Sequence, residues 1–263
     1  MNRKEFAKST GLLVVALCLS YTVNAQKNVL LDHFYNQEVS PKTGKPFHYT
    51  WDDQADSGFS QFGELFREQG AEIAMLDAEP DALNLKAAAV YIIVDPDTPA
   101  ETKTPNYMNA EAAATIARWV KKGGVLLMMS NDKNNAEFDY FNLLAGKFGM
   151  RFNKELLHPV EGKKYEMGAS VAFPAHPLFD GLKKIYMKEV SSISCSGKAK
   201  PVLAENGKNL MAEARYGKGY VLAVGDPWIY NEYIGHSRLP EDFENMQAAK
   251  NLVRLLLTGG MKN

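Results

Sequence analysis

The sequence contains very little cysteine, with only Cys18 and Cys195 among 263 residues. Cys18 lies in an N-terminal segment that we expect to be removed, so one thiol would remain. A single thiol cannot form an intrachain disulfide, and we therefore expect the hydrophobic core to stabilise the fold. Cys195 lies in a serine-rich, strand-like stretch with no motif around it. We do not expect it to act as a nucleophile.

The sequence also lacks an excess of either charge, since 30 basic residues face 31 acidic ones. A protein without a basic surplus is not expected to bind nucleic acid or an anionic membrane. Low-complexity runs are missing, and no apolar run after the N-terminal segment approaches membrane-spanning length. With 46% hydrophobic and 23% charged residues, the composition is typical of a folded, soluble protein.

The first 25 residues resemble a secretory signal peptide. Arg3, Lys4 and Lys8 precede an apolar run, Leu12–Leu19, and small residues follow at Val23-Asn24-Ala25. The apolar run is too short to span a membrane as a helix. We expect cleavage after residue 25 and an exported protein, periplasmic or extracellular, that is not inserted in the membrane.

Apolar strands alternate with helical patterns through the first half of the remaining chain. Near-continuous apolar strands in such an alternation favour a parallel sheet that is covered on both faces. The expected strands are residues 28–36, 71–76, 88–94 and 125–130, and the expected helices are residues 58–70, 109–124 and 134–150.

The pattern changes after Arg151, where short alternating strands and turn signals replace long helices. Residues 209–225 read as a hairpin that turns near Gly217 and Gly219, and we expect antiparallel strands at one edge of the sheet. A closing helix is predicted over residues 241–260. No repeat or linker divides the chain, so we predict one α/β domain over residues 26–263.

Polar residues follow four of the predicted strands. These endings are Asp32-His33-Phe34-Tyr35-Asn36, Asp95-Pro96-Asp97-Thr98, Ser130-Asn131-Asp132 and Gly225-Asp226-Pro227-Trp228. In an open parallel sheet, ligands bind beyond the carboxyl ends of the strands, so we expect the four endings to share one crevice. The alternative is local, because Asp, Asn and Ser after a strand often cap helices and turns.

The connection from Asn36 to Gly58 is unusually long for a strand-to-helix loop, which favours a lid or binding loop. It carries Phe47, His48, Tyr49, Trp51, Asp52 and Asp53. Aromatic rings beside carboxylates suit a sugar, whose apolar face stacks on a ring while its hydroxyls bond to polar groups. The same aromatics could instead attach the loop to the core.

Several motifs of familiar enzymes are missing. We find no HExxH or paired-histidine motif, no GxSxG around Ser130, and no Walker or dinucleotide glycine motif. We therefore expect no zinc site and no cofactor. A hard cation held by Asp95, Asp97, Asp132 or Asp226 stays an alternative, although their spacing matches no known calcium loop. Paired carboxylates are the best remaining catalytic option.

The candidate site residues are polar or aromatic side chains at or near the predicted crevice. The catalytic candidates are Glu137, Asp226, Glu232, Asp132 and His33. The substrate-binding candidates are Asn36, His48, Trp51, Asp95, Asp97, Asn106, Tyr107, Ser130, Asn131, Trp228, Tyr230 and Asn231.

The stretches VYIIVDPDTP, WVKKGGVLLMMSND and YGKGYVLAVGDPWIYNEY resemble the class I glutamine-amidotransferase-like superfamily. Within it, PFHYTWDDQADSGFS and NAEFDYFN are similar to a module attached to some unsaturated rhamnogalacturonyl hydrolases. The resemblance implies a flavodoxin-like, three-layer α/β sandwich. Ser130 or Asn131 stands where an amidotransferase has its nucleophilic cysteine, and no His-x-Glu follows in the right place, so glutamine hydrolysis is not expected.

The resemblance also implies an exported protein that takes part in the use of plant cell-wall or similar glycans. One hypothesis is a hydrolase that acts on oligosaccharides through the carboxylates of the crevice. The other is a non-catalytic accessory or scaffold module that binds a glycan fragment or contacts a glycan-degrading enzyme. Converging carboxylates would favour the first hypothesis, and acids that all serve as caps would favour the second.

Overall fold

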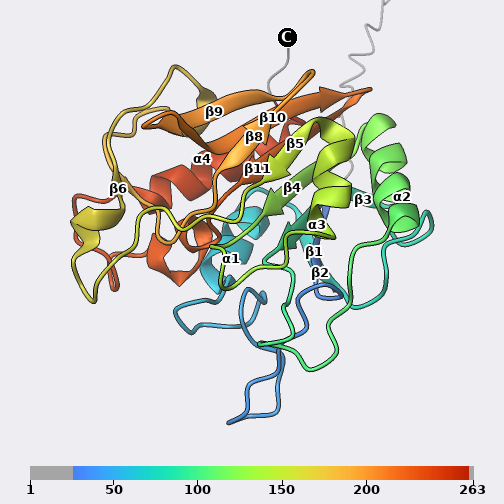
Figure 1. The fold of residues 1–263 in the computed structure, drawn as a ribbon, viewed down its shortest axis with the longest axis horizontal. Helices are drawn as coiled ribbons and strands as arrows, with labels where there is room; N and C mark the ends of the chain where they lie inside the picture. Colours follow the sequence, from blue (N-terminus) through green and yellow to red (C-terminus); the bar gives the residue numbers. More distant parts are fainter. Residues whose placement is uncertain (1–25, 261–263) are drawn as a thin grey trace, which may run out of the picture.

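The computed structural model describes residues 26–260, so the predicted signal peptide lies outside the described residues. Its centre is a seven-stranded sheet in the order β2-β1-β3-β4-β11-β10-β9 (Figure 1). The first five strands in this order are parallel, and β10 and β9 are antiparallel to their neighbours. The strands are β1 (Asn28–Asp32), β2 (Glu72–Leu76), β3 (Ala88–Val94), β4 (Val125–Met129), β9 (Lys200–Glu205), β10 (Lys208–Tyr216) and β11 (Gly219–Val224).

The mixed α/β fold with antiparallel strands at one edge, predicted from the sequence, is confirmed. The central strands β4 and β11 are buried along their whole length. Successive side chains of a strand point to opposite faces, and the residues of β3 follow this rule. Val90 and Ile92 pack in one hydrophobic cluster, whereas Tyr91 and Ile93 pack in a second. The continuous apolar runs therefore fill two cores, one on each face of the sheet.

Four α-helices contribute to these cores. The buried residues of α1 and α4 belong to the first cluster, and those of α2 and α3 belong to the second. Asn109 begins α2 as its N-cap, where its side chain accepts hydrogen bonds from two backbone N–H groups. The helices are α1 (Ser60–Glu68), α2 (Ala110–Lys121), α3 (Phe141–Ala145) and α4 (Asn245–Leu257).

The third helix is much shorter than the sequence pattern predicts. A helix was expected over residues 134–150, but α3 covers five residues and continues as a single 3-10 turn, Gly146–Phe148. Gly149 then has a left-handed backbone (φ 78°) and lies so close to Ser196 that a Cβ would come within 2.3 Å of its carbonyl oxygen. This close approach ends the helical segment after Phe148. At the other end, residues 134–140 form turns bonded to Asp132 and Glu137 and do not join the helix.

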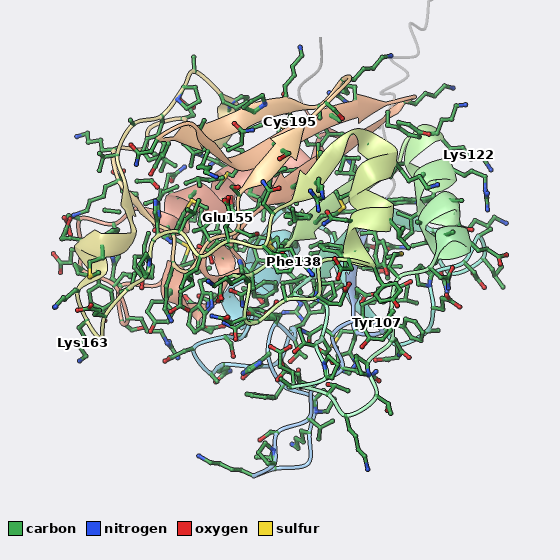
Figure 2. The ribbon with its side chains drawn as sticks, viewed as in Figure 1. Tyr107, Lys122, Phe138, Glu155, Lys163 and Cys195 are labelled. Carbon is green, nitrogen blue, oxygen red and sulfur yellow. The ribbon has the colours of Figure 1, made fainter. Side chains whose placement is uncertain are left out.

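The remaining elements are short and lie between β4 and β9 or after β11. Figure 2 marks Cys195 at the end of one of the short strands. No α-helix among residues 26–260 is both long and apolar enough to cross a membrane. The short elements are β5 (Met150–Phe152), β6 (Ala169–Ser170), β7 (Ile185–Tyr186), β8 (Ile193–Cys195), η2 (Tyr165–Gly168), η3 (Pro177–Phe179), η4 (Trp228–Tyr230) and η5 (Glu232–Ile234).

Candidate functional site

Four parallel strands, β1, β3, β4 and β11, are direct neighbours and end at the same edge of the sheet. Val94, Met129 and Val224, the last residues of three of them, are in register with one another. The segments that follow β1 and β3 gather at this end in Figure 1. A cavity of about 580 Å³ opens here, lined by His48, Tyr49, Ala55, Asp56, Ser57, Asp95, Glu101, Asn131, Asn135, Glu189 and Trp228.

The cavity wall concentrates unusual backbone conformations. Only six non-glycine residues in the described part of the chain have a positive φ. Four of them line the cavity: His48 (62°), Tyr49 (48°), Asp95 (45°) and Glu189 (56°). A left-handed backbone is unfavourable for a side chain with a Cβ, and such residues cluster at sites where function requires the geometry. This clustering marks the cavity as the candidate functional site.

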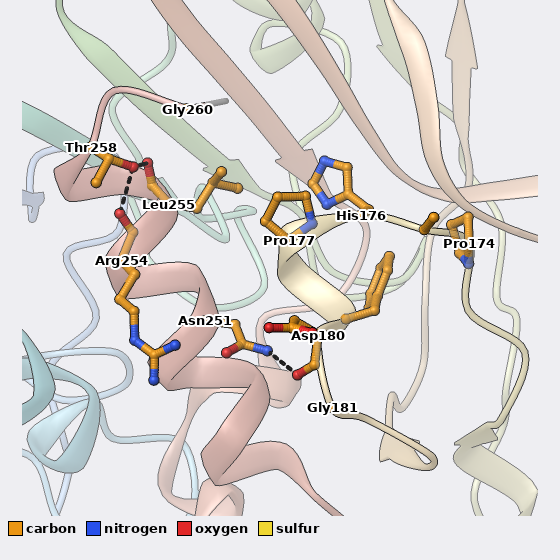
Figure 3. Close-up of a pocket in the computed structure, with 12 residues that line it drawn as sticks. Pro174, His176, Pro177, Asp180, Gly181, Asn251, Arg254, Leu255, Thr258 and Gly260 are labelled. Carbon is orange, nitrogen blue, oxygen red and sulfur yellow. Dashed lines mark hydrogen bonds between the residues drawn. The ribbon is translucent and has the colours of Figure 1, made fainter. Parts of the chain in front are cut away.

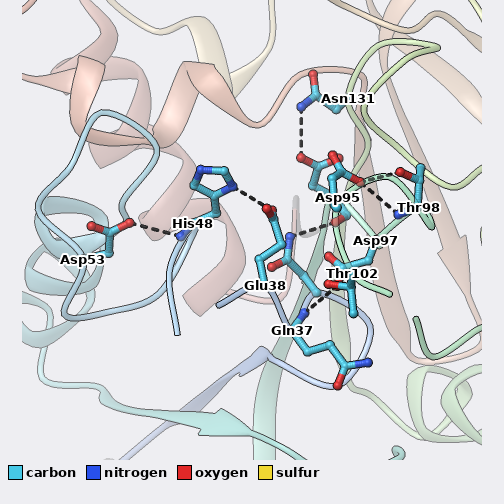
Figure 4. Close-up of polar contacts among 11 residues, drawn as sticks. Gln37, Glu38, His48, Asp53, Asp95, Asp97, Thr98, Thr102 and Asn131 are labelled. Atoms are coloured by element: carbon cyan, nitrogen blue, oxygen red, sulfur yellow. Dashed lines mark hydrogen bonds and ion pairs between the residues drawn. The ribbon is translucent and has the colours of Figure 1, made fainter. Parts of the chain in front are cut away.

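Asp95 follows β3 directly and lies at the centre of this wall. It is only 5% exposed. Its Oδ2 accepts a hydrogen bond from Nδ2 of Asn131 (2.9 Å; Figure 4). Its backbone oxygen accepts one from Nδ2 of Asn36 (2.8 Å). Its Oδ1 has no hydrogen-bond partner among the described residues. The structure thus holds a buried carboxyl group with one oxygen free.

Burial raises the pKa of Asp95 well above its usual value, and the nearby carboxylate of Glu101 raises it further. The bond from Asn131 opposes this rise. The nearby Tyr49 hydroxyl also lowers the pKa of Asp95, although the two side chains do not meet the usual distance and angle limits of a hydrogen bond. A carboxyl group whose pKa is raised keeps its proton to a higher pH than an exposed one and can then donate that proton.

A second carboxylate, Glu101, stands on the same wall. Its Oε2 accepts bonds from the backbone N–H (2.9 Å) and the hydroxyl (2.8 Å) of Thr98. Burial, and then the charges of Glu38 and Asp97, raise its pKa to about 7. Asp97 accepts bonds from the backbone of the loop after β1 and from Thr102 (Figure 4). Its other oxygen has no partner among residues 26–260.

The long loop after β1 contributes an imidazole. Nδ1 of His48 lies 2.6 Å from Oε1 of Glu38, and the backbone N–H of His48 donates to Asp53 (3.2 Å). Figure 4 shows Glu38 between His48 and the aspartates of the β3 ending. A carboxylate that holds one ring nitrogen orients the imidazole, as general bases require. The loop therefore supplies an oriented imidazole to the cavity lining.

The third side of the cavity is formed by Trp228 and Glu189. Nζ of Lys188 lies 4.3 Å from the ring centroid of Trp228 and 3.1 Å from Oε2 of Glu189. Asp226, which is 0% exposed, accepts backbone bonds from Lys188 (2.8 Å) and Trp228 (2.7 Å). Burial raises the pKa of Asp226 to about 7. Asp226 therefore lies behind this wall, where its two hydrogen bonds position Lys188 and Trp228.

Two of the candidate catalytic acids make helix-capping contacts in the structure. Glu232 is 3% exposed and accepts bonds from the hydroxyl of Ser60 (2.6 Å) and from the backbone and side chain of Gln61. Glu137 accepts bonds from the backbone N–H groups of residues 139–141 at the start of α3. Neither lines the cavity. Their acid–base roles stay predictions that these contacts do not support.

The residues after β4 are mostly occupied by local contacts. Asp132 accepts bonds from Asn134 (2.8 Å) and Asn135 (2.5 Å) in the following turn. Ser130 is fully buried, with its hydroxyl 3.4 Å from the backbone oxygen of Asn131. Of the β4 ending, only Asn131 lines the cavity, joined there by Asn135 from the turn.

Two aromatic candidates lie in the core. Trp51 packs against phenylalanines of α1 and its Nε1 donates to Ala74 (3.1 Å). Tyr230 stacks on Phe62 at 5.6 Å between ring centroids. Burial explains both positions, because a ring that fills the core removes more apolar surface from water than one at a cavity rim. Trp51 therefore fits the alternative interpretation, in which the aromatic residues attach the loop to the core.

The remaining candidates lie away from the cavity lining. Nδ1 of His33 lies 2.7 Å from Asp77, and Asn106 donates to the backbone of Phe34. Asn231 begins η5 as its N-cap. Tyr107, marked in Figure 2, stacks on the exposed Tyr140 with 4.6 Å between centroids.

The structure therefore brings together His48, Asp95, Asn131 and Trp228, with Asn36 and Asp97 as supports. The sequence did not identify several of their neighbours, because these come from distant segments or carry no motif. A positive φ at a non-glycine residue would have been the useful signal, but it cannot be read from the residue type. The missed residues are Glu38, Tyr49, Asp56, Ser57, Glu101, Asn135 and Glu189.

A larger cavity, of about 810 Å³, lies between α4 and residues 174–181 (Figure 3). Nδ2 of Asn251 already donates to two backbone oxygens there, those of Leu178 and Asp180. None of the non-glycine residues with a positive φ lines it. We therefore assign the candidate site to the strand ends and not to this cavity.

The carboxylates and the imidazole at the strand ends are not grouped as a metal centre requires. Within residues 26–260, no group of three or more His, Cys, Asp or Glu side chains is arranged to hold a metal ion. What the cavity offers is a protonatable carboxyl group, a carboxylate-oriented imidazole, amides and one indole ring. This set can bind hydroxyl groups and can transfer protons.

Comparison of the sequence with protein-family models and with curated proteins finds no match. Solved structures do match. The N-terminal domain of mmIFT52 is similar over 90% of this chain and all of its own length (TM-score 0.67, 13% identity). A GMP synthase-like protein from Thermoplasma acidophilum matches 89% of this chain and 95% of its own (TM-score 0.50, 10% identity).

A β-galactosidase from Rahnella sp. R3 is similar over 89% of this chain but only 31% of its own length (TM-score 0.52, 14% identity). The structural neighbours thus include a protein of the glutamine-amidotransferase type and part of a carbohydrate-active enzyme. At these identities the likeness concerns the fold alone. The chain shares its mixed α/β fold with these proteins.

Proposed function

We propose that this protein binds an oligosaccharide in the cavity at the carboxyl ends of β3, β4 and β11 and transfers protons to it. The observation that carries the proposal is the clustering of four strained residues around one buried carboxyl group with a free oxygen. Strain of this kind persists only where the surrounding structure maintains it. Asn36 and Asn131 supply that support at Asp95.

In this proposal Asp95 is the proton donor and His48 the proton acceptor. Burial raises the pKa of Asp95, which suits a general acid that must keep its proton near neutral pH. Glu38 orients the imidazole of His48. Trp228 provides an aromatic surface on which the apolar face of a sugar can stack.

We further propose that the chain is an exported member of the glutamine-amidotransferase-like superfamily, with the flavodoxin-like, three-layer arrangement. The strand order β2-β1-β3-β4 followed by β11 supports this arrangement. The similarity to the GMP synthase-like protein supports the superfamily. The N-terminal sequence supports export. The glycans would be plant cell-wall polysaccharides such as pectin, as the resemblance to the rhamnogalacturonyl hydrolase module implies.

A non-catalytic accessory or scaffold role is the second candidate. It is favoured by the capping contacts of Glu137, Asp132 and Glu232, which leave these three acids unavailable for chemistry. In this case the cavity would bind a glycan fragment without changing it, or the domain would contact a partner glycoside hydrolase.

One experiment separates these functions. The purified protein is mixed with pectic and other glycan fragments, and the heat of binding and the appearance of new reducing ends are both measured. The enzyme proposal expects binding and product, both lost in Asp95→Asn. Binding without product supports the accessory module. If neither appears, or if Asp95→Asn behaves as wild type, the proposed site is refuted.

A further inference from the structure

A further cavity lies at the opposite edge of the sheet from the candidate site. Its volume is about 360 Å³, and it is lined by Ala88, the first residue of β3, and by Gly124, the residue before β4. The candidate site lies beyond the other ends of these strands. Since β3 has seven residues and spans about 20 Å, the two cavities are separate.

Three cationic side chains line this cavity, whereas no acidic side chain of the described residues does. Arg118 lies in the last turn of α2 and Lys122 is its C-cap, but Lys86 comes from the connection between β2 and β3. Figure 2 marks Lys122 beside α2. All three are exposed, and none forms an ion pair among residues 26–260. We call this cavity the basic pocket.

The end of α2 accounts for only part of this charge. The C-terminal end of a helix carries about half a negative charge, which favours nearby cations. Three cations exceed that charge several-fold, and Lys86 belongs to another segment. Asp81, the acid nearest to Lys86 in the sequence, accepts bonds from the backbone N–H groups of Leu83 and Asn84 and does not line the pocket. The basic pocket therefore keeps positive charge for an anionic ligand.

An indole ring also lines the basic pocket. Trp119 is half-buried, and Tyr91 packs on it in a T-shaped contact with 6.3 Å between ring centroids. Gly124 lies so close that a Cβ would come within 2.4 Å of the indole. None of the cation–π contacts within the described part of the chain involves Trp119. The exposed part of the indole is thus held in place and is not covered by a neighbouring cation.

We propose that the basic pocket binds the carboxylate of a uronic acid sugar and forms a second glycan-binding site, remote from the strand ends. Sugar carboxylates are ionised at pH 7 and accept charge-assisted hydrogen bonds from lysine and arginine. The guanidinium of Arg118 is already positioned by Thr115, whose hydroxyl accepts a bond from Nη2 (2.7 Å). The indole of Trp119 offers apolar contact to the sugar ring.

A carboxylate fits this pocket better than a phosphate does. Phosphate groups favour the free N–H groups of a helix N-terminus, whereas the basic pocket lies at the C-terminal end of α2. The choice of a glycan as the carrier of the carboxylate rests on the proposed function, and acidic sugars agree with the pectic fragments proposed there. The pocket itself does not depend on the residues of the strand ends.

The test compares oligogalacturonates with their methyl esters, which have the same backbone without the charge. Titration calorimetry at pH 7 and low ionic strength is carried out on wild type and on Asp95→Asn, which leaves the basic pocket intact. The methyl esters report on the strand-end site alone, so the loss of binding expected for Asp95→Asn is measured with them. We expect oligogalacturonates to bind Asp95→Asn at least about tenfold more tightly than the esters do. Added salt should weaken this preference.

Two substitutions in the Asp95→Asn background locate the contact. Lys86→Gln and Arg118→Gln should each reduce the affinity for oligogalacturonates about threefold, and together about tenfold, because each removes one charged partner. Lys163→Gln is the matched control, because Lys163 is exposed and lies far from Lys122 in Figure 2. It should leave the affinity unchanged. Circular dichroism and thermal unfolding verify that each variant is folded.

The outcomes separate this inference from the proposed function. If oligogalacturonates bind Asp95→Asn through Lys86 and Arg118, the second site stands, even where the methyl esters do not bind wild type and the strand-end function fails. If the esters bind Asp95→Asn as tightly as the acids do, or if Lys86→Gln and Arg118→Gln change nothing, the inference is wrong and the strand-end site is unaffected. If inorganic phosphate or phosphatidylserine vesicles displace oligogalacturonates at equal charge, the selectivity for a sugar carboxylate is refuted.

Discussion

Replacing Asp95 with asparagine should stabilise the protein while it weakens ligand binding. In the native protein one carboxylate oxygen accepts a bond from Asn131 and the other has no partner in the described residues. An asparagine can keep the bond from Asn131 through its amide oxygen, and asparagine is among the side chains that best tolerate a left-handed backbone. The substitution therefore removes a buried ionisable group while it keeps the hydrogen bond from Asn131, and a neutral amide nitrogen takes the place of the free oxygen.

The magnitude follows from the burial of the acid. A buried polar group without a partner costs about 1–3 kcal/mol, and more when it is charged, so replacing this buried acid with a neutral amide should gain about 1–3 kcal/mol at pH 8. The pKa of Asp95 is raised in the folded state, which therefore holds the proton more tightly than the unfolded chain. Its destabilising effect appears as the pH rises above the unfolded pKa of 3.8 and grows until the folded pKa is passed. The gain should be much smaller at pH 4.

The assay is urea unfolding followed by tryptophan fluorescence at both pH values. With a slope of about 2–3 kcal/mol per molar urea, the midpoint of Asp95→Asn should rise by roughly 0.3–1.5 M at pH 8. Asp180→Asn, a control at an exposed aspartate, should not shift the midpoint. The reasoning is refuted if Asp95→Asn is less stable than wild type at pH 8, or if its gain is the same at both pH values.

Other residues give further predictions. Glu232→Gln should lower the free energy of unfolding in urea by about 1–3 kcal/mol, because Ser60 and Gln61 at the start of α1 lose their carboxylate acceptor. The same substitution should leave the affinity for sugars unchanged. Trp51→Ala should cost about 3–5 kcal/mol in the same assay, as expected for a core ring. The pKa of Asp226 is raised to about 7, so its contribution to the free energy of unfolding should decline as the pH rises from about 4 to 7. Unfolding curves across that range should show a loss on the order of a few kcal/mol. Gly225→Ala should lower the melting temperature sharply or prevent folding, since its Cβ would lie 1.8 Å from the Ser191 carbonyl oxygen; a variant as stable as wild type would contradict the close approach.

The strands of the sheet were predicted well because a buried strand must be apolar, and its residue types show this directly. A strand such as β4, covered on both faces, must be apolar at every position, and its five residues are. The third helix was predicted less well. Its apolar residues repeat at helical spacing, but bonds to Asp132 and Glu137 hold residues 134–140 in turns, and the close approach of Gly149 to Ser196, 47 positions later, ends the helical segment. Local patterns do not contain such tertiary contacts.

The candidate site was predicted in part for the same reason. Asp95 and Asn131 follow apolar strands directly, so the sheet topology places them at one edge. Glu189 reaches the cavity from a segment without any helix or strand signal, and Glu38 is recognisable only through its contact with His48. Whether a carboxylate caps a helix or faces a ligand depends on where nearby N–H groups point. Glu232, a candidate catalytic acid in the sequence, takes the capping role in the structure.

The position of β11 has a consequence for the time course of folding. This strand lies between β4 and β10 at the centre of the sheet, yet it comes about 90 residues after β4 in the chain. During synthesis, β4 remains without its second neighbour until most of the polypeptide has been made. Pairings between strands so distant in sequence are slow to form. The nascent chain should therefore stay incompletely folded until late, which would suit the export that we propose.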